Sequence, residues 1–291
     1  MTDDTDVAAA GWFADLEAGD TEAAGRAIRE ASAVEPADWP WLAVKTGFVD
    51  SEPAYYSRLQ EATIHATRQE ARAREQADDK QLLHAVRAMD DATRTANELA
   101  ERLSEWAGTL FDDQPTGIEG ARRLADREPS SPVEARVLSL AERVDGLATE
   151  ADELQAFINR QAPEIAPNLS EMAGPVLAAR LIALAGGLEQ LAKKPSGTVQ
   201  VLGAEDALFA HLAGRGSSPK HGIIYTHEYV SGTRPADRGS AARAFAGKLS
   251  IAARIDYYSG EIKPEVHEKL DERMATIRAR AAADADAEAD Q

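Results

Sequence analysis

The sequence has no cysteine and no long apolar run, and each absence excludes a class of protein. Without cysteine the chain can hold no disulfide, no thiolate metal site and no cysteine nucleophile. No stretch approaches the roughly 20 consecutive apolar residues that a membrane span needs. The first residues, MTDDTDVAAAGW, lack the basic start and apolar core of a secretory signal. We therefore expect a cytoplasmic protein.

Lysine is also scarce, whereas acidic residues are abundant. Only eight of the 32 basic residues are lysine, and 50 acidic residues bring the net charge to −18. Such a surface stays hydrated and soluble in concentrated salt, so we interpret it as an adaptation of a halophilic protein to salt. The alternative is an ordinary acidic protein that avoids nucleic acid.

Aromatic residues make up only 5% of the chain, so their gathering in one segment is informative. Seven of the 16 lie in residues 11–77, which we expect to form a small N-terminal domain with a modest core. Helical signals occur at 20–32 and 51–76, and short extended pieces are predicted near 10–14 and 41–45. The prediction for this domain is therefore α/β, with residues 1–10 outside it.

Residues 78–167 carry the pattern of two long helices joined at a tip. Leu82, Met89, Ala96, Leu103 and Leu110 recur every seven residues, which predicts a helix over 78–111 with one apolar seam. After a connection at 118–131, Ser131 is a candidate N-cap, with Pro132 as first helical residue and Glu134 as reciprocal partner. A second seam runs from there, and Pro163 and Pro167 are expected to stop the helix. Two such helices predict an antiparallel coiled-coil hairpin; by pattern alone the hairpin is either monomeric or paired with a second copy.

The segment 168–260 differs from the rest in charge. It contains ten basic and seven acidic residues, a net charge of +3, so the remainder of the chain carries −21. A polyanion would be repelled by most of this protein and could bind only here. The alternative is a helical domain that happens to have fewer acids.

This segment reads as all-helical with short extended joins. A leucine stripe begins at Leu177, Gly186-Gly187 interrupts it, and residues 198–203 alternate like a brief strand. A last long helix is predicted at about 236–257, with Phe245, Leu249 and Ala252 on its core side. A tail at 261–291 ends in AAADADAEADQ, which we expect to be partly disordered.

On the other side of the helix at 236–257, Arg243, Gly247, Ser250 and Arg254 recur at helical spacing. Two guanidinium groups separated by small residues would leave a shallow groove that a sugar-phosphate backbone fits. Arg238 and Lys248 point elsewhere on the helical wheel and would flank that groove. Alternatively, these arginines bind local carboxylates such as Asp237 or Asp256.

Two turns complete the candidate site. Gly203-Ala204-Glu205 has little side-chain bulk just before a helix, so its backbone N–H groups can approach a ligand. Pro219-Lys220-His221-Gly222 is a rigid turn that presents a cation and an imidazole, and His221 could stack on an unpaired base. A lone loop histidine is otherwise simply exposed. His221, His227 and Glu228 lack metal-site spacing, and no catalytic fingerprint is present, so we expect a scaffold and no enzyme.

The phrases AGPVLAARLIALAGGLEQLAKKPSGTVQVLGAEDALF, PKHGIIY and RGSAARAFAGKLSIAARIDYYSG match the Nop domain pattern nearly end to end. The chain thus resembles the Nop family of archaeal core scaffold proteins in box C/D guide ribonucleoproteins. It departs from that pattern at Asp206 and Ser240, where the family usually has lysine. The RNA-binding residues that the resemblance and the spacing together indicate are Gly203, Ala204, Glu205, Lys220, His221, Gly222, Arg238, Arg243, Lys248 and Arg254.

The resemblance also implies partners. It implies that 1–77 docks the methyltransferase fibrillarin, that the hairpin 78–167 forms a homodimer, and that 168–260 grips a guide RNA together with a kink-turn-binding ribosomal-type protein. The complex would direct 2′-O-methylation of rRNA, with S-adenosylmethionine on fibrillarin and no cofactor on this chain. Two alternatives stay open: a Nop-domain RNA-binding protein without a methyltransferase partner, and a coiled-coil adaptor that binds only protein.

Overall fold

The computed structural model describes residues 11–17, 19–30, 36–112 and 116–289, with side chains described up to residue 279. It divides the chain into two compact units, Met1–Ala77 and Asp78–Gln291. Every regular element within the described residues is a helix, so the prediction of a mainly α protein is confirmed. The prediction of an α/β N-terminal domain is wrong, because none of these residues forms a strand.

The N-terminal unit is built on α2 (Thr21–Glu30), α3 (Trp39–Lys45) and α4 (Glu52–Glu75). Its core is the aromatic cluster predicted from the sequence, with Phe13 and Tyr55 buried. The extended piece predicted near 41–45 is instead α3, because Asp38 accepts a hydrogen bond from the Trp41 N–H (3.2 Å) and caps the helix. Residues 11–14 form turns, and residue 10 lies outside the described residues.

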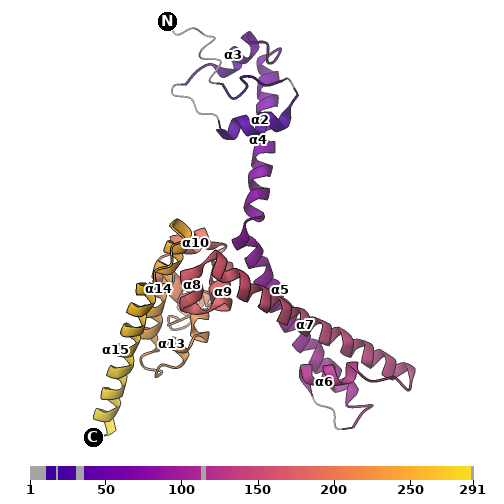
Figure 1. Ribbon diagram of the computed structural model, residues 1–291, viewed down its shortest axis with the longest axis vertical. Helices are drawn as coiled ribbons and strands as arrows, with labels where there is room; N and C mark the ends of the chain where they lie inside the picture. The colour runs from indigo at the N-terminus through magenta and orange to yellow at the C-terminus, as the bar shows by residue number, and fades with distance from the viewer. Residues whose placement is uncertain (1–10, 18, 31–35, 113–115, 290–291) are drawn as a thin grey trace. The chain divides into compact units, whose positions relative to one another are not determined.

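In the second unit, α5 (Asp78–Ala107) and α7 (Pro132–Ile165) lie side by side as the predicted hairpin (Figure 1). Leu82, Met89, Ala96 and Leu103 are buried between them, as the seven-residue repeat predicts. Leu110 lies past the end of α5 and is exposed.

The tip of the hairpin holds a helix that the sequence pattern did not indicate. The connection 118–131 contains α6 (Gly117–Ala125), which packs against both long helices through Ala121 and Leu124. Ile118, Ala121 and Leu124 have the helical spacing that could have predicted it. A salt bridge from Arg122 to Asp145 (3.1 Å) adds a polar contact to α7.

Both ends of α7 follow local rules. Ser131 Oγ accepts a hydrogen bond from the Glu134 N–H (3.2 Å), which confirms the N-cap. The Glu134 carboxylate, however, accepts from the Ser130 N–H and hydroxyl, and not from Ser131. The prediction that Pro163 stops the helix is wrong: α7 continues to Ile165, because a proline in the last turn removes only one hydrogen bond. The helix does end just before Pro167, as predicted.

The remaining helices are α8 (Pro167–Ala173), α9 (Pro175–Ala185), α10 (Leu188–Lys193), α11 (Ser196–Val201), α12 (Glu205–Leu212), the 3₁₀ turn η1 (Ile223–Thr226), α13 (Glu228–Ser231), α14 (Arg238–Tyr258) and α15 (Pro264–Ala289). Most of the others pack on α14, whereas α9 packs on α5, α7 and α8. The brief strand predicted at 198–203 is wrong, since α11 occupies most of that range. α15 continues to Ala289 over part of the predicted tail, and residues 290–291 lie outside the described residues.

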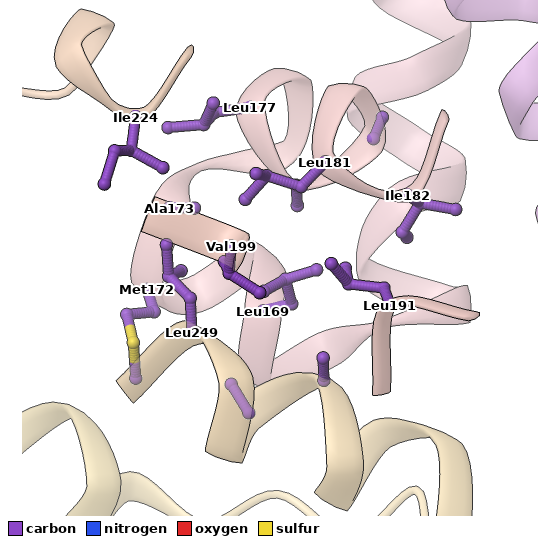
Figure 2. Close-up of a cluster of buried hydrophobic side chains, with 14 of the residues drawn as sticks. Leu169, Met172, Ala173, Leu177, Leu181, Ile182, Leu191, Val199, Ile224 and Leu249 are labelled. Atoms are coloured by element: carbon purple, nitrogen blue, oxygen red, sulfur yellow. The ribbon is translucent and has the colours of Figure 1, made fainter. Parts of the chain in front are cut away.

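One core joins this helical cluster to the base of the hairpin. Leu82 and Val86 of α5 belong to the same buried cluster as Leu181 of α9 and Phe245 of α14. Figure 2 shows Leu181, Val199 and Leu249, from three different helices, pointing toward one another. Residues on the two sides of the predicted boundary at 167/168 therefore share a core.

The Gly186-Gly187 turn between α9 and α10 is held by the first turn of α5. Both glycines have positive φ (93° and 136°), which only glycine adopts without strain. Lys80 Nζ donates to the Gly186 carbonyl (2.5 Å), and Asp79 accepts from the Leu188 N–H at the start of α10 (2.8 Å). The start of the hairpin is thus fixed to the helical cluster by polar contacts as well as by apolar packing.

Asp256 near the end of α14 holds the start of α8. Its buried carboxylate accepts hydrogen bonds from the backbone N–H groups of Asn168 (3.0 Å) and Leu169 (2.8 Å) and from Asn168 Nδ2 (2.6 Å). Burial raises the pKa of the Asp256 carboxyl, while these N–H donors oppose the rise. The group is structural, and it is not a partner of the arginines as one sequence alternative held.

Candidate nucleic-acid interface

A cleft of about 710 Å³ lies between α11, the segment before Lys220 and the first turns of α14. Among the residues that line it are Lys220, Gly239, Ser240 and Arg243. Its two charged residues are Lys220 and Arg243, and no acidic residue lines it. The chain has a net charge of −18, but the only charged residues of this cleft are positive. An anion that enters it is therefore not repelled by the residues that line it.

Arg243 has the environment expected of a ligand contact. Its side chain is exposed, and no hydrogen bond or ion pair to it occurs among the residues that the structure describes. It lies one helical turn beyond Gly239, so both line the same wall of the cleft. Lys248, five residues further along α14, is partly buried and does not line the cleft.

Arg254 is engaged within the fold. Its Nε donates to the Ala192 carbonyl (3.1 Å) and its Nη2 donates to the Lys194 carbonyl (3.2 Å), so it satisfies the last carbonyls of α10. Ser250, predicted to form the floor of a groove between Arg243 and Arg254, is buried and donates to the Ala246 carbonyl (2.9 Å). The structure therefore does not contain the groove predicted along this face of α14.

The loop at 219–222 is pinned to the end of α11. The Gly222 N–H donates to the Gln200 carbonyl (2.8 Å), and the Ile223 N–H donates to the Leu202 carbonyl (2.7 Å). A Cβ at Gly222 would lie 1.9 Å from the Leu202 oxygen, so no other residue fits there without moving the backbone. This close approach gives a physical reason for glycine at the end of the predicted turn.

His221 lies on a ladder of stacked side chains. Its ring stacks on Tyr225, with centroids 4.6 Å apart and an interplanar angle of 20°. The Arg238 guanidinium lies 5.4 Å from the Tyr225 centroid, a cation–π contact. Arg238 is itself held by the carbonyls of Thr233 (3.1 Å) and Ser231 (3.4 Å). Arg238 therefore supports one end of the ladder from within the fold, and His221 forms the other end.

The turn at Gly203-Ala204-Glu205 is closed by its own side chain. The Glu205 carboxylate accepts a hydrogen bond from the Gly203 N–H (2.9 Å), and the Ala204 N–H donates to the Val201 carbonyl (3.0 Å). The backbone donors that were expected to approach a ligand thus have partners already. None of these three residues lines the cleft.

His227 belongs to a different environment from His221. Its Nδ1 accepts a hydrogen bond from the Tyr229 N–H (3.2 Å) and caps α13, and its ring lies 4.6 Å from that of Phe245. Burial lowers the pKa of His227, which keeps the capping nitrogen unprotonated at neutral pH. Burial and a hydrogen bond to Asp271 raise the pKa of the neighbouring Tyr229 to about 12.

Four of the predicted site residues lie at or beside one cleft. Lys220 and Arg243 line it, and His221 and Gly222 directly follow Lys220 in the chain. Two side chains that shape this region were not among the predicted site residues, namely Gln200 and Tyr225. Tyr225 follows His221 by four residues, but a pairing of the two rings across a 3₁₀ turn has no signature in the sequence. Among the described residues, no helix is both long and apolar enough to cross a membrane.

Comparison with known proteins gives four findings. The family model described as "Nop: snoRNA binding domain, fibrillarin" matches residues 78–276. A NOP5 family protein of Methanocaldococcus jannaschii is 34% identical over 269 residues, covering 80% of this chain and 65% of that protein. Nucleolar protein 56 of Saccharomyces cerevisiae is 30% identical over 246 residues, covering 67% of this chain and 49% of that protein.

The chain therefore spans only about half to two thirds of the length of these relatives. The fourth finding concerns the fold. A chain in the solved structure of a fibrillarin/Nop5p complex has a TM-score of 0.54 and 23% sequence identity, covering 92% of this chain and 98% of that one. The two chains share a fold.

Proposed function

Because the chain belongs to the Nop family, we propose that it is a non-catalytic scaffold subunit of a box C/D guide ribonucleoprotein. In this proposal it bridges a fibrillarin-like methyltransferase to a guide RNA that a kink-turn protein has already bound. The reaction is transfer of a methyl group to a ribose 2′-hydroxyl of a guided target RNA. S-adenosylmethionine belongs to the methyltransferase, and this chain supplies position only.

The observation that carries the proposal is the cation-only cleft beside the His221 ladder. Lys220 and Arg243 can bind phosphate oxygens, and the His221 ring can stack on a base of an unpaired nucleotide. With only two cations in the cleft, phosphate contacts alone give modest affinity, and most of it would be lost in salt. A second protein bound to the RNA would supply the rest, which favours recognition of a composite surface.

The N-terminal unit offers a surface for the methyltransferase. Trp41 and Tyr56 are 49% and 53% exposed, although most aromatic residues of this unit are in its core. Lys45 lies over the Trp41 ring (4.5 Å), and Val44 is also exposed beside it on α3. Exposed tryptophan and tyrosine are frequent anchors of protein interfaces. These side chains are the ones we assign to fibrillarin docking.

The hairpin offers a surface for a second copy. Near its tip Trp106, Leu110 and Val133 are exposed, and along α7 Leu140 and Leu147 are only partly buried. Apolar side chains left uncovered along a seamed helix are expected where another helix packs. Self-association would give the particle two methyltransferase arms.

A gel-shift titration of the purified chain against a box C/D kink-turn RNA tests the proposal. It is run with and without the kink-turn protein, in potassium chloride from about 0.2 M to about 2 M. A shift that requires the kink-turn protein and persists at high salt is the expected result, and persistence would also fit the salt-adapted surface. Absence of a shift at every salt concentration would contradict the RNA function.

A second candidate, a Nop-domain RNA-binding protein without a methyltransferase partner, has one observation in its favour. The matched family region begins at residue 78, so the N-terminal unit lies outside it. Co-purification with a fibrillarin-like methyltransferase separates the two. Trp41→Ala should abolish co-purification without affecting the gel shift, while Trp39→Phe, a change within the core aromatic cluster, should leave both intact.

A further inference from the structure

Gln200 holds the loop that presents Lys220 and His221, and it does so with both its backbone and its side chain. The Gln200 carbonyl accepts from the Gly222 N–H (2.8 Å), and Gln200 Nε2 donates to the Lys220 carbonyl (2.7 Å). These two bonds fix the loop on either side of His221. Since Gln200 lies in the last turn of α11, the loop is tied to a regular element that packs on α14.

The stem of Lys220 is supported from a second direction. The position where Gly239 would carry a Cβ lies 3.7 Å from Lys220 Cδ and 4.0 Å from its Cβ and Cγ, so the aliphatic stem runs along the backbone of α14. No partner for the Lys220 ammonium occurs within the described part of the chain. The side chain is therefore held along its aliphatic stem, and Lys220 lines the cleft together with Arg243.

We propose that Gln200 is a positioning residue for the phosphate contact of Lys220, an inference that rests on the RNA-binding function proposed above. A lysine on an unrestrained loop must lose both loop and side-chain freedom when it binds a phosphate. The Gln200 bond to the Lys220 carbonyl removes part of that loss beforehand. Gln200 acts through Lys220, so its contribution disappears when Lys220 no longer carries a charge.

This dependence can be measured as a thermodynamic cycle. The full chain is prepared as wild type, Gln200→Met, Lys220→Gln and the double variant. Met has a similar length to Gln and favours helix, but it has no donor for the Lys220 carbonyl. The probe is a box C/D kink-turn RNA saturated with kink-turn protein, and Kd is measured over a range of potassium chloride concentrations.

One phosphate contact contributes about 0.7–0.9 to the slope of log Kd against log salt, which corresponds to about 5- to 8-fold in Kd at ~0.1 M salt. Lys220→Gln should lower the slope by this amount. Gln200→Met should also lower the slope, and it should weaken binding by up to the same factor of about 5 to 8. The double variant should bind no more weakly than Lys220→Gln alone.

Ser196→Ala is the matched control. Ser196 is an exposed polar residue of the same helix, but it does not line the cleft and makes no side-chain hydrogen bond among the described residues. Its replacement should leave Kd and the salt slope unchanged. Gln200→Leu, which also removes the donor and adds no charge to the cleft, should reproduce Gln200→Met and guards against a defect peculiar to methionine.

Each other outcome overturns the inference in a recognisable way. If the losses from Gln200→Met and Lys220→Gln add, Gln200 contacts the RNA itself or stabilises the fold independently of Lys220. If Gln200→Met and Gln200→Leu bind like wild type, the loop needs no such restraint. If the wild-type chain fails to bind the RNA complex at any salt concentration, the proposed function is wrong, and the inference falls with it.

Discussion

Arg243 and Arg254 share a face of α14 in the sequence, but their environments predict opposite results for the same substitution. Arg243→Gln should weaken RNA binding and leave stability unchanged, whereas Arg254→Gln should reduce stability first. The reason is that Arg243 is exposed at the cleft, while Arg254 donates to the carbonyls of Ala192 and Lys194. Comparison of the two variants thus separates a ligand contact from a structural one.

The size of the Arg254 effect follows from its two hydrogen bonds. A bond from a charged donor is worth about 1.5–3 kcal/mol when it is shielded from water. The bond to Ala192 is partly buried and keeps much of that value, whereas the bond to Lys194 is exposed and keeps little. The free energy of unfolding should therefore fall by about 1–3 kcal/mol in Arg254→Gln, measured by urea denaturation followed by circular dichroism.

The size of the Arg243 effect follows from counterion release. With no partner to lose in the described structure, Arg243→Gln should change the free energy of unfolding by less than about 0.5 kcal/mol. Loss of one phosphate contact should weaken binding to the RNA–kink-turn protein complex by about 5- to 8-fold at ~0.1 M salt, and by almost nothing at ~1 M. Both quantities are measured on the same preparations.

Arg273→Gln is the control for a general loss of positive charge, since Arg273 is an exposed residue of α15 that does not line the cleft. It should change neither stability nor binding. The reasoning is refuted if Arg254→Gln is as stable as wild type and binds as weakly as Arg243→Gln. In that case the whole face would be a ligand surface, as the sequence alone suggested.

Three further predictions concern the structure around the cleft. Asp256→Ala should lower the free energy of unfolding by about 2–5 kcal/mol, because it leaves two buried N–H groups without an acceptor. Asp256→Asn should lower it less. Urea denaturation measures both variants, with the exposed Glu268→Ala as control. Burial lowers the pKa of His227, so the unfolded state takes up its proton first, and stability should fall as pH drops below about 6.5. His227→Asn keeps a helix cap and should show a smaller fall between about pH 7.5 and 5.5; an equal fall would contradict the assignment. Gly222→Ala should abolish the gel shift, because its Cβ would lie 1.9 Å from the Leu202 oxygen, and wild-type binding would show that the loop can move.

Long-range repeats made most of the architecture predictable from the sequence. The seven-residue repeat through Leu82 and Leu103 predicted the hairpin, and Phe245 and Leu249 predicted the buried side of α14. Short segments were less predictable. Residues 41–45 and 198–203 alternate like strands, but Asp38 caps a helix at the first, and α11 packs against α14 at the second. Tertiary packing decides such short pieces.

The candidate site was predictable in part for a similar reason. Residues that are neighbours in the sequence, such as Lys220, His221 and Gly222, remain together in the structure. The roles of Arg238 and Arg254 depended on carbonyls elsewhere in the fold, which no spacing of side chains reveals. Ser250 is buried because helices surround α14 on more than one side. A helical wheel gives the direction of a side chain but not what it meets.

The hydrogen bonds of Asp79 and Lys80 with the Gly186–Leu188 segment have a consequence for how the length of the hairpin can vary. The start of α5 and the end of α7 are both part of one buried core. The outer portions of the two helices can therefore change in length without altering that core. Each seven residues added to or removed from both α5 and α7 would move the tip by about 10 Å. The length of the hairpin sets the distance between partners bound at its tip and partners bound at its base. This distance can therefore change between related proteins in steps of one heptad, while the binding site at the base stays the same.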